Sequence, residues 1–370
     1  MSSSISTTPP ERRSGGERAP LAITLGDACG IGPETIVRAY ALGEAGDCVV
    51  FGDARWLART AREMHFDPDC SRPPIAELAS LDEADGVPPG CIPVLPVVQL
   101  PDDLRRGRVD ARAGAAAYAC IEAAAREALQ GRVAAVVTAP IHKAALHAAG
   151  VDFPGHTEIL QHIAGGVPVR MMLANPQLRT VLVTVHMALR RAIDAVTTES
   201  VLETVRIAHA AACGWGIAAP RIAVAGLNPH AGEDGLFGDE EARVIAPAIA
   251  QACAEGIDAT GPYPPDTVFM RARHDPPGHP GAFDLVIAMY HDQGLIPVKY
   301  LGVEQGVNVT LGLPFVRTSP DHGTAFDIAG TDRADPSSLV AAIRMARQLV
   351  GGPGRVAARA AQASESQTEQ

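Results

Sequence analysis

The stretch that decides the fold is TVLVTVH, residues 180–186. Two other runs share its character: RIAVAGLNPH at residues 221–230 and LVIAMYH at residues 285–291. Each is apolar, rich in β-branched or branched aliphatic residues, and ends in a histidine. Such runs between helical segments predict buried parallel strands. Because ligands of open α/β sheets bind just beyond the carboxyl ends of the strands, we expect the three histidines to face one site.

These histidines, His186, His230 and His291, predict a metal site. Neutral imidazole suits Zn, Co, Ni or Fe, and three protein ligands that leave a position open are typical of a catalytic rather than a structural site. The alternative is that each histidine only ends its strand and hydrogen-bonds the backbone. Three of the twelve histidines at equivalent positions favour the metal site.

Alternating strands and helices extend over most of the chain. The expected strands lie at residues 21–25, 48–51, 92–98, 134–138, 171–174, 180–186, 221–226, 285–291 and 307–311, and the expected helices at 33–42, 112–129, 200–213, 239–254 and 337–350. A capping box of Ser200 and Glu203 is expected to begin the third helix. The alternation predicts an α/β protein with largely parallel sheets.

Composition indicates a soluble globular protein. The chain has 370 residues, 47% of them hydrophobic, and a mean hydropathy of +0.08, which predicts large cores and two domains. The seven cysteines are scattered without a C-x-x-C pair, so neither a disulfide framework nor a thiolate zinc site is expected. We find no signal-peptide core and no membrane-spanning run, and we therefore expect a cytoplasmic protein without a membrane partner. The polar ends, residues 1–19 and 353–370, are expected to be disordered tails.

The charge distribution limits the ligands. A net charge of −11 argues against nucleic acid as a partner, so any anionic ligand must be held by local cations. Only two of the 31 cationic residues are lysines, Lys143 and Lys299. Either these two lysines occur by chance, or they mark places where a compact ammonium group is required.

Several loops carry more polar residues than a structural loop needs. Residues 26–34 follow a strand and begin a helix, so their backbone amides could face an anion. Their glycine spacing is not G-x-G-x-x-G, so this loop does not support an ordinary Rossmann domain. Residues 138–143 and 154–158 also lead into helices, and the latter place His156 and Thr157 where an anion could bind, unless Thr157 is only an N-cap. The densest polar cluster spans residues 290–325.

With these loops in view, the chain resembles the 4-hydroxythreonine-4-phosphate dehydrogenase family of pyridoxal phosphate biosynthesis. The matching segments, in family order between Gly30 and Ala325, are GIGPE, APIHK, GHTE, LNPHAGE, GPYPPDT, YHDQG, NVTLGLP and RTSPDHGTA. The resemblance implies two α/β/α domains like those of isocitrate and isopropylmalate dehydrogenases. We expect the first domain at 20–140 plus 318–352 and the second at 141–317. It also implies NAD or NADP as hydride acceptor and a homodimer with the active site at its interface.

Carried over by position, the resemblance implies roles for ten residues. The metal ligands fall on the three strand-end histidines already selected. The other positions are the substrate contacts His156, Thr157, Lys299, Asn308 and Arg317, and the candidates for proton transfer or ligand orientation Asp266 and Asp292. Asp292 could equally serve only as a partner of its neighbouring histidine. Neither Lys143 nor the cofactor contacts receive an assigned role.

The chain departs from the family pattern in three places. The first loop reads GDACGIGPE where Pro-Ala usually follows the aspartate, the loop at 272–283 is longer than usual, and the N-terminal tail is an addition. The extra histidines of the longer loop, His274 and His279, are expected to be exposed loop residues rather than ligands.

The implied reaction is metal-dependent oxidation of 4-phosphohydroxy-L-threonine, with Zn, Co or Mg as the ion, followed by decarboxylation to 3-amino-2-oxopropyl phosphate. Two alternatives lie in the same superfamily: dehydrogenases of D-threonate or D-erythronate 4-phosphate, and those of aromatic cis-dihydrodiols. The phosphate-type residues disfavour the dihydrodiol. A non-catalytic metal or metabolite sensor is a further alternative, for which the set of acids, ligands and cations is excessive.

Overall fold

The computed structural model describes residues 19–66, 71–274 and 280–351. Apart from residue 19, both expected tails lie outside the described residues, as does His279 of the longer loop. Within the described residues no helix is both long and apolar enough to cross a membrane.

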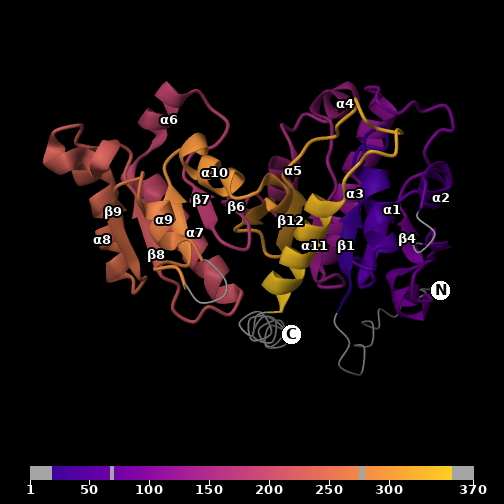
Figure 1. Ribbon diagram of the computed structural model, residues 1–370, viewed down its shortest axis with the longest axis horizontal. Coiled ribbons are helices and arrows are strands. Elements are labelled where there is room, and N and C mark those ends of the chain that lie inside the picture. The colour runs from indigo at the N-terminus through magenta and orange to yellow at the C-terminus, as the bar shows by residue number, and fades with distance from the viewer. Residues whose placement is uncertain (1–18, 67–70, 275–279, 352–370) are drawn as a thin grey trace, which may run out of the picture.

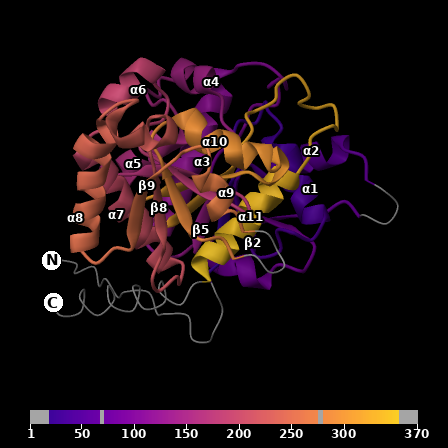
Figure 2. The ribbon, with the colours of Figure 1, turned by 60° about the vertical axis from the view of Figure 1, so that its left-hand side comes forward.

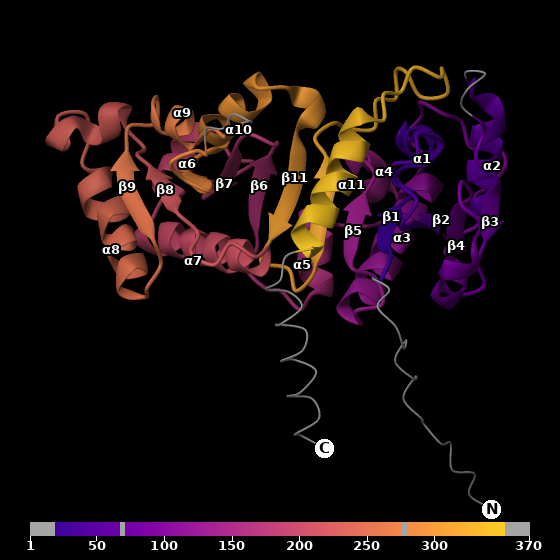
Figure 3. The same ribbon diagram turned by 60° about the horizontal axis from the view of Figure 1, so that its bottom comes forward.

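The described strands form one twelve-stranded sheet in the order β3-β4-β2-β1-β5-β12-β11-β6-β7-β10-β8-β9, visible as a continuous row in Figure 3. Their bounds are β1 Leu21–Thr24, β2 Cys48–Gly52, β3 Ile75–Glu77, β4 Ile92–Pro96, β5 Ala135–Thr138, β6 Arg170–Ala174, β7 Arg179–Leu182, β8 Ile222–Ala225, β9 Ala259–Tyr263, β10 Leu285–Ala288, β11 Val307–Leu311 and β12 Val316–Pro320. The expected largely parallel α/β sheet is therefore confirmed.

Helices cover this sheet. The α-helices are α1 Gly32–Ala41, α2 Ala54–Glu63, α3 Ala111–Leu129, α4 Lys143–Ala148, α5 His156–Ile163, α6 Leu189–Ala195, α7 Thr198–Gly214, α8 Ala246–Ala254, α9 Val268–Ala272, α10 His291–Tyr300 and α11 Ser337–Val350; the shorter turns are η1 Leu81–Gly86, η2 Pro229–Gly235, η3 Glu241–Ile245 and η4 Val303–Gln305. Every residue of β1, β2, β5, β8 and β10 is buried. Strands buried on both faces read as continuous apolar runs, which is why the sequence predicted them.

Two parallel halves meet at an antiparallel centre. In the first half β1 pairs in parallel with β2 and β5, and in the second β10 pairs in parallel with β7 and β8. Between them β11 runs antiparallel to both β12 and β6. The halves lie side by side along the long axis (Figure 1), and Figure 2 shows the molecule with the second half turned toward the viewer. The boundary expected between residues 317 and 318 falls inside β12, and α4 and α5 of the expected second domain pack on α3 of the first.

A local capping signal fixes the start of α7, and it differs from the predicted one. Helix α7 begins at Thr198, and its capping box is formed by Thr197 and Ser200: the Thr197 hydroxyl accepts from the Ser200 amide at 3.1 Å, and the Ser200 hydroxyl accepts from the Thr197 amide at 2.9 Å. The expected box of Ser200 and Glu203 is wrong, because Glu203 instead pairs with Arg170.

Three strands were not predicted, and the histidines lie farther from their strands than expected. Strands β3, β9 and β12 are short or polar. Strands β7, β8 and β10 end at Leu182, Ala225 and Ala288, so several residues separate each strand from its histidine.

Candidate active site

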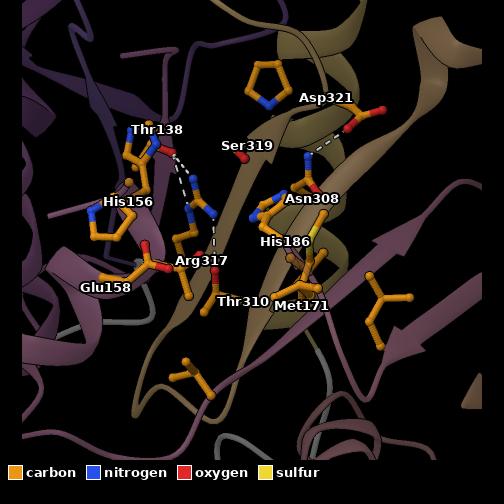
Figure 4. A pocket seen from close by; sticks show the side chains of 18 of the residues that line it. Thr138, His156, Glu158, Met171, His186, Asn308, Thr310, Arg317, Ser319 and Asp321 are labelled. Atoms are coloured by element: carbon orange, nitrogen blue, oxygen red, sulfur yellow. Dashed lines mark hydrogen bonds between the residues drawn. The ribbon is translucent and has the colours of Figure 1, made fainter. Parts of the chain in front are cut away.

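A cavity of about 550 Å³ opens between the two halves (Figure 4). Its walls come from the loop after β5, the start of α5, the segment after β7, helix α10 and the facing strands β11 and β12. Of the ten site residues predicted from the sequence, the seven that line the cavity are His156, Thr157, His186, His291, Lys299, Asn308 and Arg317. Two of them, His186 and His291, follow the carboxyl ends of parallel strands, and the other five come from α5, α10, β11 and β12.

Arg317 is the most deeply buried charge of the cavity. Its side chain projects from β12. Nη2 donates to the Thr138 hydroxyl at 2.6 Å and Nη1 donates to the Thr310 hydroxyl at 3.1 Å. Among the described residues no carboxylate forms an ion pair with it, and burial lowers its pKa to about 10, against the opposing charge of Glu158. The guanidinium therefore stays protonated at neutral pH. A buried cation held only by hydroxyl groups is suited to a negatively charged ligand.

The start of α5 adds neutral donors and acceptors beside Arg317. His156 is half-buried, and its Nε2 has no hydrogen-bond partner among the described residues. Burial and the Arg317 charge hold the pKa of His156 well below its usual range, so the imidazole is neutral. Gly155 is the N-cap and makes no side-chain cap, so Thr157 is a helix residue and not the cap considered from the sequence. The amides of this first turn are available to an anion.

His186 and His291 lie together across the end of the sheet, with ring centroids 5.6 Å apart. They come from β7 and β10, which are neighbours in the sheet. Burial, Lys143 and His291 lower the pKa of His186, which favours the neutral form that binds metals. The Nδ1 atom of His291 lies 2.7 Å from Oδ1 of Asp292, an exposed carboxylate, so Asp292 is placed as a partner of the histidine.

His230 does not join this pair. It lies in η2, where residues 230–234 all have positive φ, and its Nδ1 is 3.4 Å from Glu233. Buried Glu241 accepts hydrogen bonds from the backbone amides of Leu227 and Asn228, both at 2.7 Å, and so fixes the start of this loop. Within the described part of the chain, no three His, Cys, Asp or Glu side chains are grouped to hold a metal ion.

Asp266 also lies apart from the cavity. It is exposed after β9, the edge strand next to β8, and β9 contacts η2. His230 and Asp266 therefore lie on neighbouring loops, which follow β8 and β9 at the same edge of the sheet.

The glycine loop at residues 26–34 is buried and does not face the cavity. A Cβ atom at Gly30 would lie 2.8 Å from the Thr324 carbonyl oxygen, so the loop is covered by the segment after β12. The expectation that its amides face an anion is wrong in this arrangement, because tertiary packing fills the space in front of them.

Sequence reasoning assigned no role to several residues that share the cavity with the predicted ones. Asp321 accepts a hydrogen bond from Asn308 and pairs with Lys299, while Lys143 and Glu158 also line the cavity and act electrostatically on His186. Each belongs to a polar motif that the sequence drew attention to. Only the three-dimensional contacts show which member of a motif reaches the ligand space.

Fold and site define an α/β enzyme with a cavity for a small anionic metabolite and two apposed imidazoles beside it. Residues 44–346 match the family described as "Pyridoxal phosphate biosynthetic protein PdxA", and the chain belongs to this family. It is therefore an oxidoreductase, and the family implies a nicotinamide cofactor.

Relatives support this membership. The chain is 53% identical to the 4-hydroxythreonine-4-phosphate dehydrogenase of Beijerinckia indica over 331 residues, which cover 89% of this chain and 95% of the relative. It is 46% identical to the D-threonate 4-phosphate dehydrogenase of Salmonella typhimurium, covering 90% and 99%. A crystal structure of 4-hydroxythreonine-4-phosphate dehydrogenase from Klebsiella pneumoniae superposes with a TM-score of 0.81 at 43% identity, covering 90% and 99%.

Proposed function

We propose that the protein oxidises 4-phosphohydroxy-L-threonine to 2-amino-3-oxo-4-phosphobutanoate, with NAD or NADP as hydride acceptor and a divalent ion, Zn, Co or Mg, as Lewis acid. The product then loses carbon dioxide to give 3-amino-2-oxopropyl phosphate. The observation that carries this proposal is the buried guanidinium of Arg317, which faces the cavity without a carboxylate partner among the described residues. A phosphate or carboxylate supplies the missing negative charge.

Substrate binding follows from the charges on the cavity wall. Arg317 and the first turn of α5, with Thr157 and neutral His156, hold one anionic group. The ammonium group of Lys299, at the end of α10, pairs with Asp321 and is the second cation of the wall, so we propose that it holds the other anionic group. These two cationic positions match a substrate that carries both a phosphate and a carboxylate, and they do not match an uncharged diol ring.

The metal is proposed to bind at His186 and His291, with His230 as the third ligand. The two apposed imidazoles fit a metal, since His186 is held neutral and His291 is oriented by Asp292. One chain alone leaves the third position open. An ion bound there would lower the pKa of the substrate hydroxyl and polarise the ketone that forms.

We further propose that the working unit is a homodimer in which the partner subunit's His230 completes the metal site and the partner subunit's Asp266 takes part in proton transfer. Both positions lie on exposed loops at one sheet edge, away from the cavity of their own chain. Exposed large apolar side chains are concentrated in the same half: Met187, Leu189, Ile193, Leu236, Phe237, Met270, Ile296 and Tyr300. Such a surface favours association with a second copy.

The oxidation removes a hydride from the substrate carbinol carbon to the nicotinamide and a proton from its hydroxyl. In the β-keto acid that results, the bond to the carboxylate breaks, carbon dioxide leaves, and the electron pair moves to the ketone oxygen before a proton restores the ketone. The chain contributes the electrostatics: Lys299 and Arg317 bind the anionic ends and fix the carbinol between them. We propose a cytoplasmic location, as expected for a biosynthetic oxidoreductase.

The direct test is absorbance of NADH or NADPH at 340 nm with purified protein, each divalent ion and 4-phosphohydroxy-L-threonine. Metal-dependent absorbance and release of carbon dioxide support the proposal. Absence of turnover with every ion and both cofactors contradicts it.

A second candidate is oxidation of D-threonate 4-phosphate, favoured by the 46% identical Salmonella typhimurium relative. That substrate has a hydroxyl where the first has an ammonium group. Side-by-side kinetics on the two compounds decide between them, and the higher kcat/KM identifies the physiological substrate class.

A further inference from the structure

The loop between β8 and η3 contains a left-handed turn. Residues 230–234, which begin at His230, all have positive φ, from 43° to 84°. Four of these five residues carry a side chain, and the left-handed conformation is unfavourable for them because Cβ crowds the following carbonyl oxygen. Such a turn persists only where the surrounding structure holds it, and strained segments of this kind are typical of functional sites.

One carboxylate holds the chain just before the turn. Glu241 lies at the start of η3 and is 5% exposed. Its Oε1 accepts from the backbone amides of Leu227 and Asn228, both at 2.7 Å, and its Oε2 accepts from Nδ2 of Asn228 at 2.9 Å. The residues two and three positions before His230 are therefore fixed to η3.

The same carboxylate supports the turn after His230. A Cβ atom at Gly232 would lie 2.8 Å from Oε2 of Glu241, so the backbone of the turn lies against this oxygen and only glycine leaves room for it. The turn is closed by the Phe237 amide, which donates to the Gly232 carbonyl oxygen at 3.1 Å. His230 thus lies between two contacts that are both made by Glu241.

The imidazole of His230 is oriented by this backbone. Its side chain is 63% exposed. Its neighbours among the described residues belong to its own loop: the Glu233 carboxylate, 3.4 Å from Nδ1, and the exposed Phe237 ring, with centroids 6.4 Å apart. Because no buried neighbour packs the ring in place, the direction in which it points depends on the left-handed turn.

We propose that Glu241 is a positioning residue for the metal: its carboxylate holds the left-handed turn and thereby presents the His230 imidazole, already oriented, to the ion. This inference rests on the proposed function, in which His230 supplies the third ligand. In this role Glu241 contacts neither the substrate nor the ion and acts through His230. A ligand that is ordered before the ion binds loses less conformational entropy on binding, so the turn raises the affinity for the metal.

The test is a double-mutant cycle on cobalt(II) binding to the full-length protein. The visible absorbance of the bound ion gives the dissociation constant without any turnover. Glu241→Ala removes the support of the turn, and we expect it to raise the dissociation constant by about 10-fold to about 100-fold. In the His230→Ala background the same change should have less than about a 2-fold effect, because Glu241 acts only through His230.

Asp239→Asn is the matched control. Asp239 lies two residues before Glu241, its side chain is 63% exposed, and it pairs with Arg243. The variant removes one negative charge near the turn and leaves the Glu241 contacts in place, so the dissociation constant should change by less than about 2-fold. Melting temperatures of all variants separate a loss of His230 orientation from a loss of overall stability. An unchanged dissociation constant in Glu241→Ala, or an equal rise with and without His230, overturns the proposal.

A milder variant covers the case in which Glu241→Ala does not fold. In Glu241→Gln the amide oxygen still accepts from the two backbone amides, but the NH2 group meets the NH2 group of Asn228. This variant must raise the dissociation constant by at least about 3-fold, and a smaller rise overturns the proposal.

Failure of the inference and failure of the proposed function give different results. If His230→Ala binds cobalt(II) as tightly as the wild type, His230 is not a ligand and the proposed metal site fails. Hydrogen exchange of the amides of residues 227–234, followed by mass spectrometry, tests Glu241 separately. Exchange must be faster in Glu241→Ala than in the wild type and unchanged in Asp239→Asn, and equal exchange in Glu241→Ala and the wild type overturns the inference whatever the metal does.

Discussion

Replacing Arg317 by methionine should weaken substrate binding without lowering the free energy of unfolding. Burial lowers the pKa of this guanidinium from 12.5 to about 10, which corresponds to about 3 kcal/mol of unfavourable electrostatic free energy in the empty cavity. Methionine removes that cost but leaves the hydroxyls of Thr138 and Thr310 without their donor, at about 1 kcal/mol each. The free energy of unfolding should therefore stay unchanged or rise by up to about 2 kcal/mol.

Substrate binding should change in the opposite direction. Loss of charge-assisted hydrogen bonds to an anion costs about 2 to 4 kcal/mol, which is an increase in KM of about 30-fold to about 1000-fold. Initial rates from NADH absorbance give KM, and urea titration gives the free energy of unfolding. Arg317→Lys, which keeps the charge but loses the planar fork, should lie between the two. Arg126→Met is the control, since Arg126 is exposed on α3, away from the cavity, and pairs with Glu122.

A KM that rises less than about 3-fold in Arg317→Met would refute the assignment of Arg317 to the anion site. A fall in the free energy of unfolding of more than about 2 kcal/mol in Arg317→Met would refute the argument that the buried Arg317 charge destabilises the ligand-free protein.

Three further predictions concern a buried acid, the metal and the dimer. Burial raises the pKa of Asp27 from 3.8 to about 6, so the folded protein binds this proton more tightly than the unfolded chain. The resulting contribution to the free energy of unfolding is complete below pH 3.8 and is lost as the pH rises through 6. Between pH 5 and pH 8 the free energy of unfolding should therefore fall by about 1.4 kcal/mol. Asp27→Asn should remove that loss, and urea titrations at the two pH values that give the same difference for variant and wild type would contradict it. His291→Ala should bind less than about one tenth of the wild-type metal by elemental analysis while keeping its far-UV circular dichroism, and stoichiometric metal in the variant would exclude His291 as a ligand. Mixed dimers of His186→Ala and His230→Ala should regain activity, because one of the two sites is then intact. Mixed dimers of His186→Ala and Lys299→Met should not, since both residues line the cavity of one chain. Equal inactivity of the two mixtures would contradict a metal site completed by the partner subunit's His230.

The sequence predicted the buried parallel strands well because burial on both faces leaves an unbroken apolar run. It did not predict β12, since Arg317, Thr318 and Ser319 give that strand a polar pattern. Arg317 is tolerated at the centre of the sheet only because hydroxyls of neighbouring strands accept from it. Strand patterns assume an apolar surrounding, and a strand that borders a ligand cavity breaks that assumption.

Site residues were predictable to the extent that strand ends converge. His186 and His291 follow neighbouring strands and meet, as expected from the carboxyl-end rule. His230 follows β8, which lies one strand farther out, and buried Glu241 holds the start of its loop. The order of strands and the partner of a buried carboxylate are tertiary properties, so neither the separation of His230 nor the contacts of Asp321 could be read from motif spacing.

The distribution of primary amines has a practical consequence. The chain contains two lysines, Lys143 and Lys299, and both line the same cavity. Apart from the N-terminal amine, every amine-directed reagent therefore reacts with this protein at the substrate cavity or not at all. Trinitrobenzenesulfonate or a fluorescent succinimidyl ester becomes a site-specific probe without any engineered residue, and protection from labelling measures how fully a phosphorylated compound fills the cavity. The same chemistry means that aldehyde fixation and coupling to amine-reactive surfaces would modify the substrate cavity.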